Sequence, residues 1–189
     1  SLGPEHPITS GSLNNLGLLY SDQGLYKKAE PLFVRALAID EKVLGSEHFS
    51  TASTLNNLAI VYGEQNLFEK AELYFLRAIE ITEKVYGSEH PSTGNGFKNL
   101  AMLYMEQGLY EKAEPLIRGG ITLDFSLIQR ETPYLPLSER TSFIASFGSI
   151  FEKAFSFAGR SSKGLKLAMY TRLNKQGLLE EIEKRQSQL

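Results

Sequence analysis

The chain has 189 residues, of which 42% are hydrophobic and 22% are charged, and its formal net charge at pH 7 is −2. These values are ordinary for a soluble globular protein, argue against disorder, and give no reason to expect nucleic acid or an acidic membrane surface as a partner. Cysteine is absent, which excludes disulfides, thiolate metal sites and a cysteine nucleophile within this chain.

The start of the chain gives the first expectation about location. It reads Ser1-Leu2-Gly3 rather than beginning with Met, no secretory signal follows, and no apolar run approaches the ~18 residues needed to cross a membrane. The lack of cysteine suits the cytosol. We therefore expect a cytoplasmic piece of a longer protein, with no membrane as a partner.

Three loop segments of similar sequence recur every 42 residues, at Gly3–Pro7, Gly45–Phe49 and Gly87–Pro91. Other positions repeat in the same register: Leu16, Leu58 and Leu100; Tyr20, Tyr62 and Tyr104; and Ala29, Ala71 and Ala113. Chance is a poor explanation for so many matches at one period. The pattern therefore predicts three copies of one structural unit.

The second copy predicts a pair of helices. The first spans roughly 50–65, and its apolar residues fall on one helical face: Leu55, Leu58, Ala59 and Tyr62. The second spans roughly 67–86, with an apolar stripe of Ala71, Phe75, Ala78 and Ile79. Asn66 separates the two helices, as Gly24 and Gly108 do in the other copies, because these residue types tolerate left-handed backbone at a helix end.

The spacing of Leu55-Asn56-Asn57-Leu58, Tyr62, Ala71-Glu72 and Ala78 resembles the consensus of the tetratricopeptide (TPR) repeat. A long second helix and the Glu-His loop extend the period beyond the usual ~34 residues, which resembles the kinesin-light-chain subclass. The resemblance covers about residues 3–131. It implies an all-α fold in which residues 1–131 form three repeats of a right-handed superhelix.

Residues 132–189 predict a separate helical module. Residues 1–132 hold 11 basic and 17 acidic side chains, whereas residues 133–189 hold 9 and 5, so the net charge changes sign. Pro133 and Pro136 end the third repeat. Helices are expected at about 139–158 and 165–188. We expect them to cap the open end of the array, although the many Phe residues of the first could instead pack on a downstream domain.

This module is similar to the connector that follows TPR arrays in bacterial, especially cyanobacterial, CHAT proteins. The match lies in Tyr134–Arg140 and Leu173–Glu180, where Asn174 and Gln176 depart from the usual basic pattern. The resemblance implies an alternative function. In it, the chain is the regulatory or sensor arm of a caspase-like CHAT peptidase whose catalytic domain is absent from this chain.

In TPR proteins the first helix of each repeat lines the concave surface, so the resemblance implies a partner-binding face there. Polar side chains would hold the backbone of an extended peptide, an apolar floor follows one helical turn later, and an acidic edge lies beyond it. In that order the predicted residues are Asn14, Asn56 and Lys98, then Leu18, Ile60 and Met102, then Asp22, Glu64 and Glu106.

Two alternatives stay open for this face. The apolar residues could pack only against the next repeat. The second asparagine of each pair could hydrogen-bond between helices and only shape the scaffold; these residues are Asn15, Asn57 and Asn99.

Nothing in the sequence predicts an enzyme. A nucleophile needs a positioned base, and the three histidines, His6, His48 and His90, all fall in equivalent loops between repeats. Neighbouring helices lie ~8–10 Å apart while zinc–nitrogen bonds are ~2.1 Å, so we expect these histidines to satisfy backbone groups rather than bind metal. The leading function is therefore interaction with a protein or peptide, without cofactor or nucleic acid.

Overall fold

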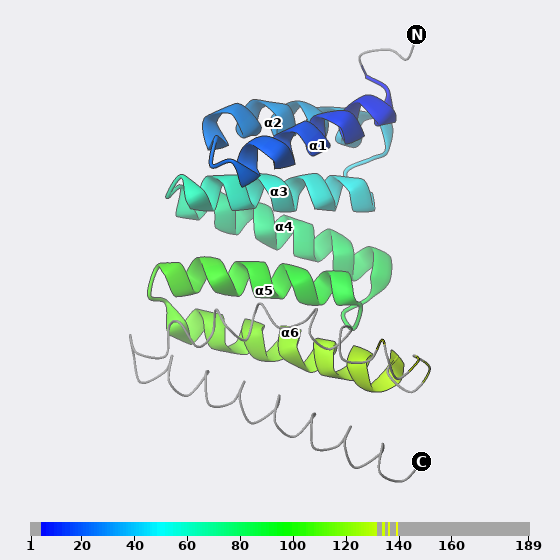
Figure 1. Cartoon of the computed structure of the whole chain (residues 1–189), viewed down its shortest axis with the longest axis vertical. Helices are drawn as coiled ribbons and strands as arrows, with labels where there is room; N and C mark the ends of the chain where they lie inside the picture. The colour runs from blue at the N-terminus through cyan, green and yellow to red at the C-terminus, as the bar shows by residue number, and fades with distance from the viewer. Residues whose placement is uncertain (1–4, 132–133, 135, 137–138, 140–189) are drawn as a thin grey trace. The chain divides into compact units, whose positions relative to one another are not determined.

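The computed structural model describes residues 5–131 together with Tyr134, Pro136 and Glu139. Its helices are α1 (Pro7–Asp22), α2 (Tyr26–Val43), α3 (Phe49–Glu64), α4 (Phe68–Tyr86), α5 (Pro91–Glu106) and α6 (Tyr110–Glu131) (Figure 1). This part of the chain contains no strand, which confirms the all-α prediction. The two helices expected in the second repeat are present and begin or end within about one residue of the predicted bounds.

The predicted C-terminal module lies outside the described residues, apart from Tyr134, Pro136 and Glu139. Its two capping helices and its connector role toward a CHAT domain therefore stay predictions, as does the boundary between residues 1–131 and 132–189. Within the described residues, no helix combines the length and apolar character that a bilayer crossing requires.

The chain divides into two compact units between Leu103 and Tyr104, a point within α5. In the N-terminal unit, α1 packs against α2, α2 against α3, and α3 against α4, so that consecutive helices form stacked antiparallel pairs (Figure 1). The remainder of α5 and α6 belong to the second unit. The stacking makes the N-terminal unit an α-solenoid.

Histidine side chains begin the first helix of each repeat. The Nδ1 atoms of His6, His48 and His90 each accept a hydrogen bond, 3.2 Å long, from the backbone N–H two residues later. Each bond satisfies one of the donors that the first turn of a helix leaves without a partner. The prediction that these histidines serve backbone groups is confirmed.

The turn within each repeat uses left-handed backbone, as predicted. The φ angles of Gly24, Asn66 and Gly108 are +71°, +60° and +74°. The next residue then donates its N–H to the carbonyl of the tyrosine five residues earlier, for example Leu67 to Tyr62 at 2.8 Å. This is the hydrogen bond of a Schellman motif, and it reverses the chain for the second helix.

Packing differs between the first and second repeats at equivalent apolar positions, and most clearly at Leu16. Leu58 is fully buried, whereas Leu16, which is 42 residues earlier, is 41% exposed. In the described structure α3 is covered by α2 and α4, but α1 belongs to the first layer and has a helix pair on one side only. The repeat pattern predicted the residue type at Leu16 and could not predict its exposure.

Candidate functional site

Six of the predicted site residues lie on one surface of the N-terminal unit. Asn14, Leu18 and Asp22 follow each other at four-residue spacing on α1, and Asn56, Ile60 and Glu64 do so on α3. Such spacing places each set on one face of its helix. We call these six residues the asparagine face. The two asparagines are half-buried, Leu18 and Ile60 are 41% and 37% exposed, and both carboxylates are exposed.

The third predicted set is divided between the two units. Lys98 and Met102 are half-buried on the part of α5 that belongs to the N-terminal unit. Glu106 is exposed and belongs to the second unit. The residues of α1 and α3 can therefore be described together, whereas the place of Glu106 on the same face stays a prediction.

Asparagines link the first helices of successive repeats. Asn57 donates through Nδ2 to Oδ1 of Asn14 at 3.4 Å, and Asn99 donates in the same way to Asn56 at 2.8 Å. The prediction that the second asparagine of each pair hydrogen-bonds between helices is thus confirmed for Asn57 and Asn99. These bonds also hold the carboxamides of Asn14 and Asn56 in fixed orientations.

At the junction between α1 and α3, a buried polar network fills the space behind Asn14. Asn14 donates through Nδ2 to Oγ1 of Thr54 at 2.8 Å, and Thr54 donates that hydroxyl to Oδ2 of Asp40 on α2, also at 2.8 Å. Thr54 and Asp40 are both buried. Ser10 donates to the carbonyl of Ala36 at 3.2 Å. These buried polar groups are therefore hydrogen-bonded within the protein.

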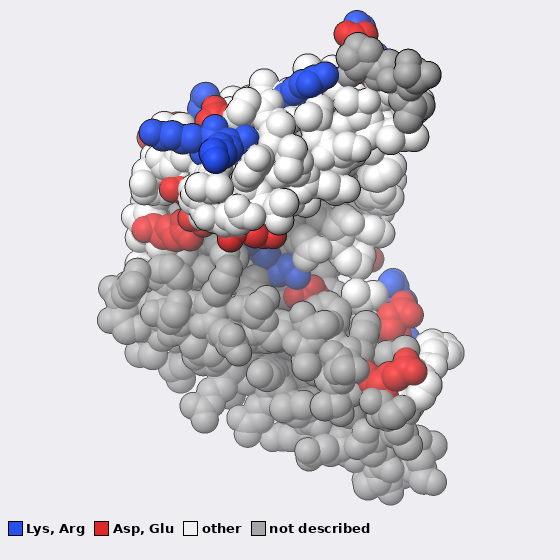
Figure 2. Space-filling view, turned by 45° about the horizontal axis from the view of Figure 1, so that its top comes forward, with Lys and Arg blue, Asp and Glu red and all other residues white. Residues whose placement is uncertain are grey.

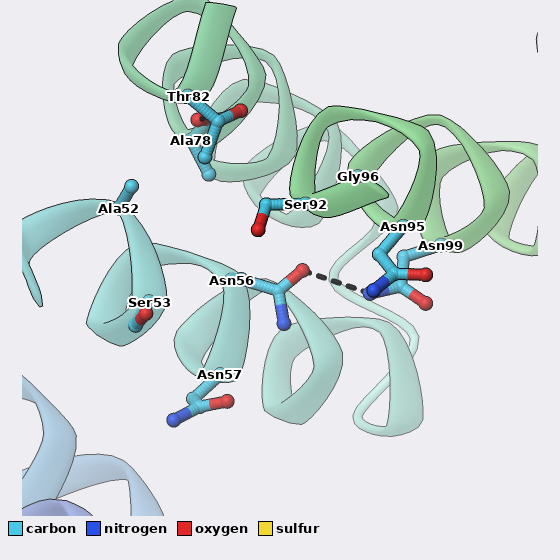
Figure 3. A pocket seen from close by; sticks show the side chains of 10 residues that line it. All are labelled: Ala52, Ser53, Asn56, Asn57, Ala78, Thr82, Ser92, Asn95, Gly96 and Asn99. Carbon is cyan, nitrogen blue, oxygen red and sulfur yellow. Dashed lines mark hydrogen bonds between the residues drawn. The ribbon is translucent and has the colours of Figure 1, made fainter. Parts of the chain in front are cut away.

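At the next junction, between α3 and α5 over α4, there is instead a pocket of about 230 Å³. Carboxamides and hydroxyls line most of it: Asn56, Asn57, Asn95, Asn99, Ser53, Thr82 and Ser92. Ala52, Ala78 and Gly96 complete the wall. Figure 3 shows Asn56 directed from α3 toward α5, where the hydrogen bond from Asn99 reaches its oxygen.

The acidic edge of the asparagine face is partly engaged with α2. Tyr26 donates its hydroxyl to Oε2 of Glu64 at 3.0 Å, and this hydrogen bond raises the pKa of Tyr26 above its ordinary value. Asp22 is exposed. In the upper part of Figure 2, several Lys and Arg side chains gather on one side with acidic side chains among them, and further Asp and Glu side chains lie below.

Thr54, Asp40 and most of the residues that form the pocket were not predicted from the sequence as functional. A signal for them was present in the repeat. Thr54 has Gly96 at the position 42 residues later, and Asp40 has Thr82 there. Two such departures from the repeat on facing helices would have indicated that the second junction is built differently from the first.

Comparison with known proteins gives a sequence match and a structural match. A tetratricopeptide repeat family profile matches residues 8–84 and 68–118. No curated protein sequence matched the chain.

Among solved structures, the chain is similar to BtubC (BKLC) from P. vanneervenii, with a TM-score of 0.64 and 19% identity over 92% of this chain. It spans 64% of the length of that structure. It is also similar to a Podosopora anserina chain of nearly identical TPR-like repeats assigned as a kinesin light chain, with a TM-score of 0.56, 20% identity and 97% coverage of both chains. At these identities the likeness establishes the fold.

Proposed function

Because the chain belongs to the tetratricopeptide repeat family, whose repeats generally mediate protein–protein interaction, we propose that it binds a partner peptide or protein in extended form along the asparagine face. The role is binding rather than catalysis. The partner is another polypeptide, and the chain supplies a preformed surface for it.

The observation that supports this proposal most is the exposure of Leu18 and Ile60 beside asparagines that are already fixed. Two aliphatic side chains in the same register on adjacent helices remain accessible to water, although the residues beside them on α3, Ala59 and Val61, are fully buried. Burying such side chains against a partner would contribute roughly 1 kcal/mol or more each.

The polar residues around this apolar pair would orient the partner. The carboxamides of Asn14 and Asn56 are held by neighbouring helices, so they lose little conformational freedom when they meet a peptide backbone. Asp22 and Glu64 are exposed at the far end of the face and favour a Lys or Arg in the partner. Association should therefore weaken as the salt concentration rises.

Leu18 and Ile60 are better test positions than the asparagines, because Asn14→Ala or Asn56→Ala would also break hydrogen bonds between helices. A photo-crosslinking residue at position 60 would identify the partner in extracts of cells that express the chain. Titration of that partner against Leu18→Ser and Ile60→Ser variants should then show at least roughly tenfold weaker binding for each.

The matched control is Leu73→Ser on α4, since Leu73 is 63% exposed and lies on the second helix of its repeat. This variant should bind the partner as the unmodified chain does. If Leu73→Ser weakens binding while Leu18→Ser and Ile60→Ser leave it unchanged, the binding surface is on the other side of the helix pairs and the proposal fails.

A further inference from the structure

The two junctions between repeats in the N-terminal unit differ at several positions, and two of these differences bear on the pocket at the second junction. At the first junction, the hydroxyl of Thr54 lies between Asn14 and Asp40, 2.8 Å from each partner atom. At the second junction the equivalent residues are Gly96 and Thr82. Neither of them can reproduce the bridge, for different reasons.

Gly96 has no side chain, and a Cβ atom there would lie 2.7 Å from Cγ1 of Ile79, so the close approach of α5 to α4 requires glycine. Thr82 has a hydroxyl but uses it on its own helix, donating to the carbonyls of Ala78 and Ile79 at 3.1 and 2.9 Å. The space that Thr54 and Asp40 fill at the first junction is therefore left vacant at the second.

The vacancy leaves the amide group of Asn56 without an acceptor. Its Oδ1 atom accepts a hydrogen bond from Asn99, but its Nδ2 atom makes none with the described residues, whereas the equivalent atom of Asn14 donates to Thr54. Figure 3 shows the Asn56 carboxamide among the residues that line the pocket, with Ser92 and Asn95 on the facing helix α5. A ligand in the pocket would lie beside this half-buried carboxamide, whose orientation is held by the hydrogen bond from Asn99.

The lining indicates which chemical group fits. None of the lining residues is charged, so a carboxylate or ammonium group would lose its hydration without meeting a counter-charge. A purely apolar group would leave amide and hydroxyl groups unpaired. A carboxamide carries an acceptor for Nδ2 of Asn56 and two donors for the oxygens of Ser92 and Asn57. At about 230 Å³ the pocket lies below the ~300–1,000 Å³ of sites for drug-sized molecules, which suits a single side chain.

We propose that this pocket binds the side-chain carboxamide of an asparagine or glutamine. The source of that side chain, a partner extended along the asparagine face, rests on the proposed function, but the pocket itself does not. The second junction would then select for one residue of the partner. The first junction, already filled by Thr54 and Asp40, has no such selectivity.

The test uses blocked amino acids as probes on the full 189-residue chain, so that no partner is needed. N-acetyl-glutamine N-methylamide is titrated while the amide signals of Asn56, Ser92 and Asn95 are followed by NMR. The leucine, glutamate and lysine analogues share its backbone and report on side-chain preference. We expect saturable shifts with the glutamine probe, at a dissociation constant at least threefold lower than with any analogue.

Two variants and a matched control locate the effect. Ser92→Ile fills the pocket with the residue that α1 carries at the equivalent position, Ile8, and should abolish the shifts. Ser50→Ile makes the same change at the first junction and should leave binding intact. Asn56→Asp keeps the acceptor for Asn99 and removes the donor, so it should remove the preference for glutamine. The remaining NMR signals verify that each variant is folded.

The outcomes separate this inference from the proposed function. If no probe gives a saturable shift, if leucine binds as well as glutamine, or if Ser92→Ile has no effect, the carboxamide pocket is wrong, while the partner titrations with Leu18→Ser and Ile60→Ser are unaffected. If the partner binds Leu18→Ser and Ile60→Ser as tightly as the unmodified chain while the glutamine probe still binds, the proposed function is wrong and the carboxamide pocket is supported.

Discussion

Asn66 is the only described residue other than glycine with a positive φ angle, +60°, and its side chain is exposed. Left-handed backbone costs most residues roughly 1–2 kcal/mol relative to glycine, with asparagine among the better tolerated. Asn66→Ala should therefore lower the free energy of unfolding by about 1 kcal/mol, and Asn66→Gly should raise it slightly. Urea unfolding measures both. Equal stability of the Ala and Gly variants would contradict a backbone origin.

The buried hydroxyl of Tyr62 should make the free energy of unfolding depend on pH. Burial, reinforced by Glu30 and Tyr74, raises the pKa of its hydroxyl from 10.0 to about 12. The folded state therefore holds this proton more tightly than the unfolded state does. The resulting contribution to stability is complete below pH 10 and is lost as the pH rises from 10 to 12.

Between pH 9 and pH 11, the free energy of unfolding should therefore fall for the unmodified chain by about 1 kcal/mol more than it falls for Tyr62→Phe. Urea unfolding at a series of pH values measures the two slopes. Tyr20→Phe, at the half-buried equivalent position in the first repeat, controls for the general effect of removing a phenol. Identical slopes for the unmodified chain and Tyr62→Phe would refute the assignment.

At the scale of the element, α1 contains two glycines in opposite environments. A Cβ atom on Gly11 would meet nothing within 4 Å, whereas one on Gly17 would lie 2.7 Å from the ring of Phe33, which is fully buried. Alanine stabilises the interior of a helix by about 1 kcal/mol relative to glycine, but overpacking a core destabilises a protein by roughly 1–3 kcal/mol. Gly11→Ala should raise the melting temperature and Gly17→Ala should lower it. Stabilisation by both would show that Phe33 can move aside.

The helices were predictable because their signals are local. His48 caps α3 and Asn66 turns the chain after it, and both act on backbone groups within a few residues. The junctions were not predictable in the same way. Asn14 meets Thr54 only because layers 40 residues apart stack in one register, and the role of Thr54 depends in turn on Asp40. A residue pattern shows which positions repeat, but it does not show which polar side chains form hydrogen bonds between layers.

Within each of the first two repeats, an ion pair links the loop before the first helix to the second helix. Lys42 on α2 meets Glu5 in the loop before α1 at 2.6 Å, and Lys84 on α4 meets Glu47 in the loop before α3 at 2.7 Å. The ion pairs repeat at 42 residues, and all four side chains are largely exposed. Exposed ion pairs contribute little to stability. Because these pairs also join parts of a single repeat, other contacts, such as the hydrogen bond from Asn14 to Thr54, must hold the layers together.

If stacked layers supply the stability, the same substitution should cost different amounts at equivalent positions. Leu58 is fully buried between α2 and α4, so Leu58→Ala should lower the free energy of unfolding by about 3 kcal/mol. Leu16 on α1 is 41% exposed, so Leu16→Ala should lower the free energy of unfolding by only about 1 kcal/mol. Urea unfolding of both variants at several protein concentrations tests this. A loss at Leu16 that equals the loss at Leu58 and grows with concentration would mean that another chain covers α1 as the next layer.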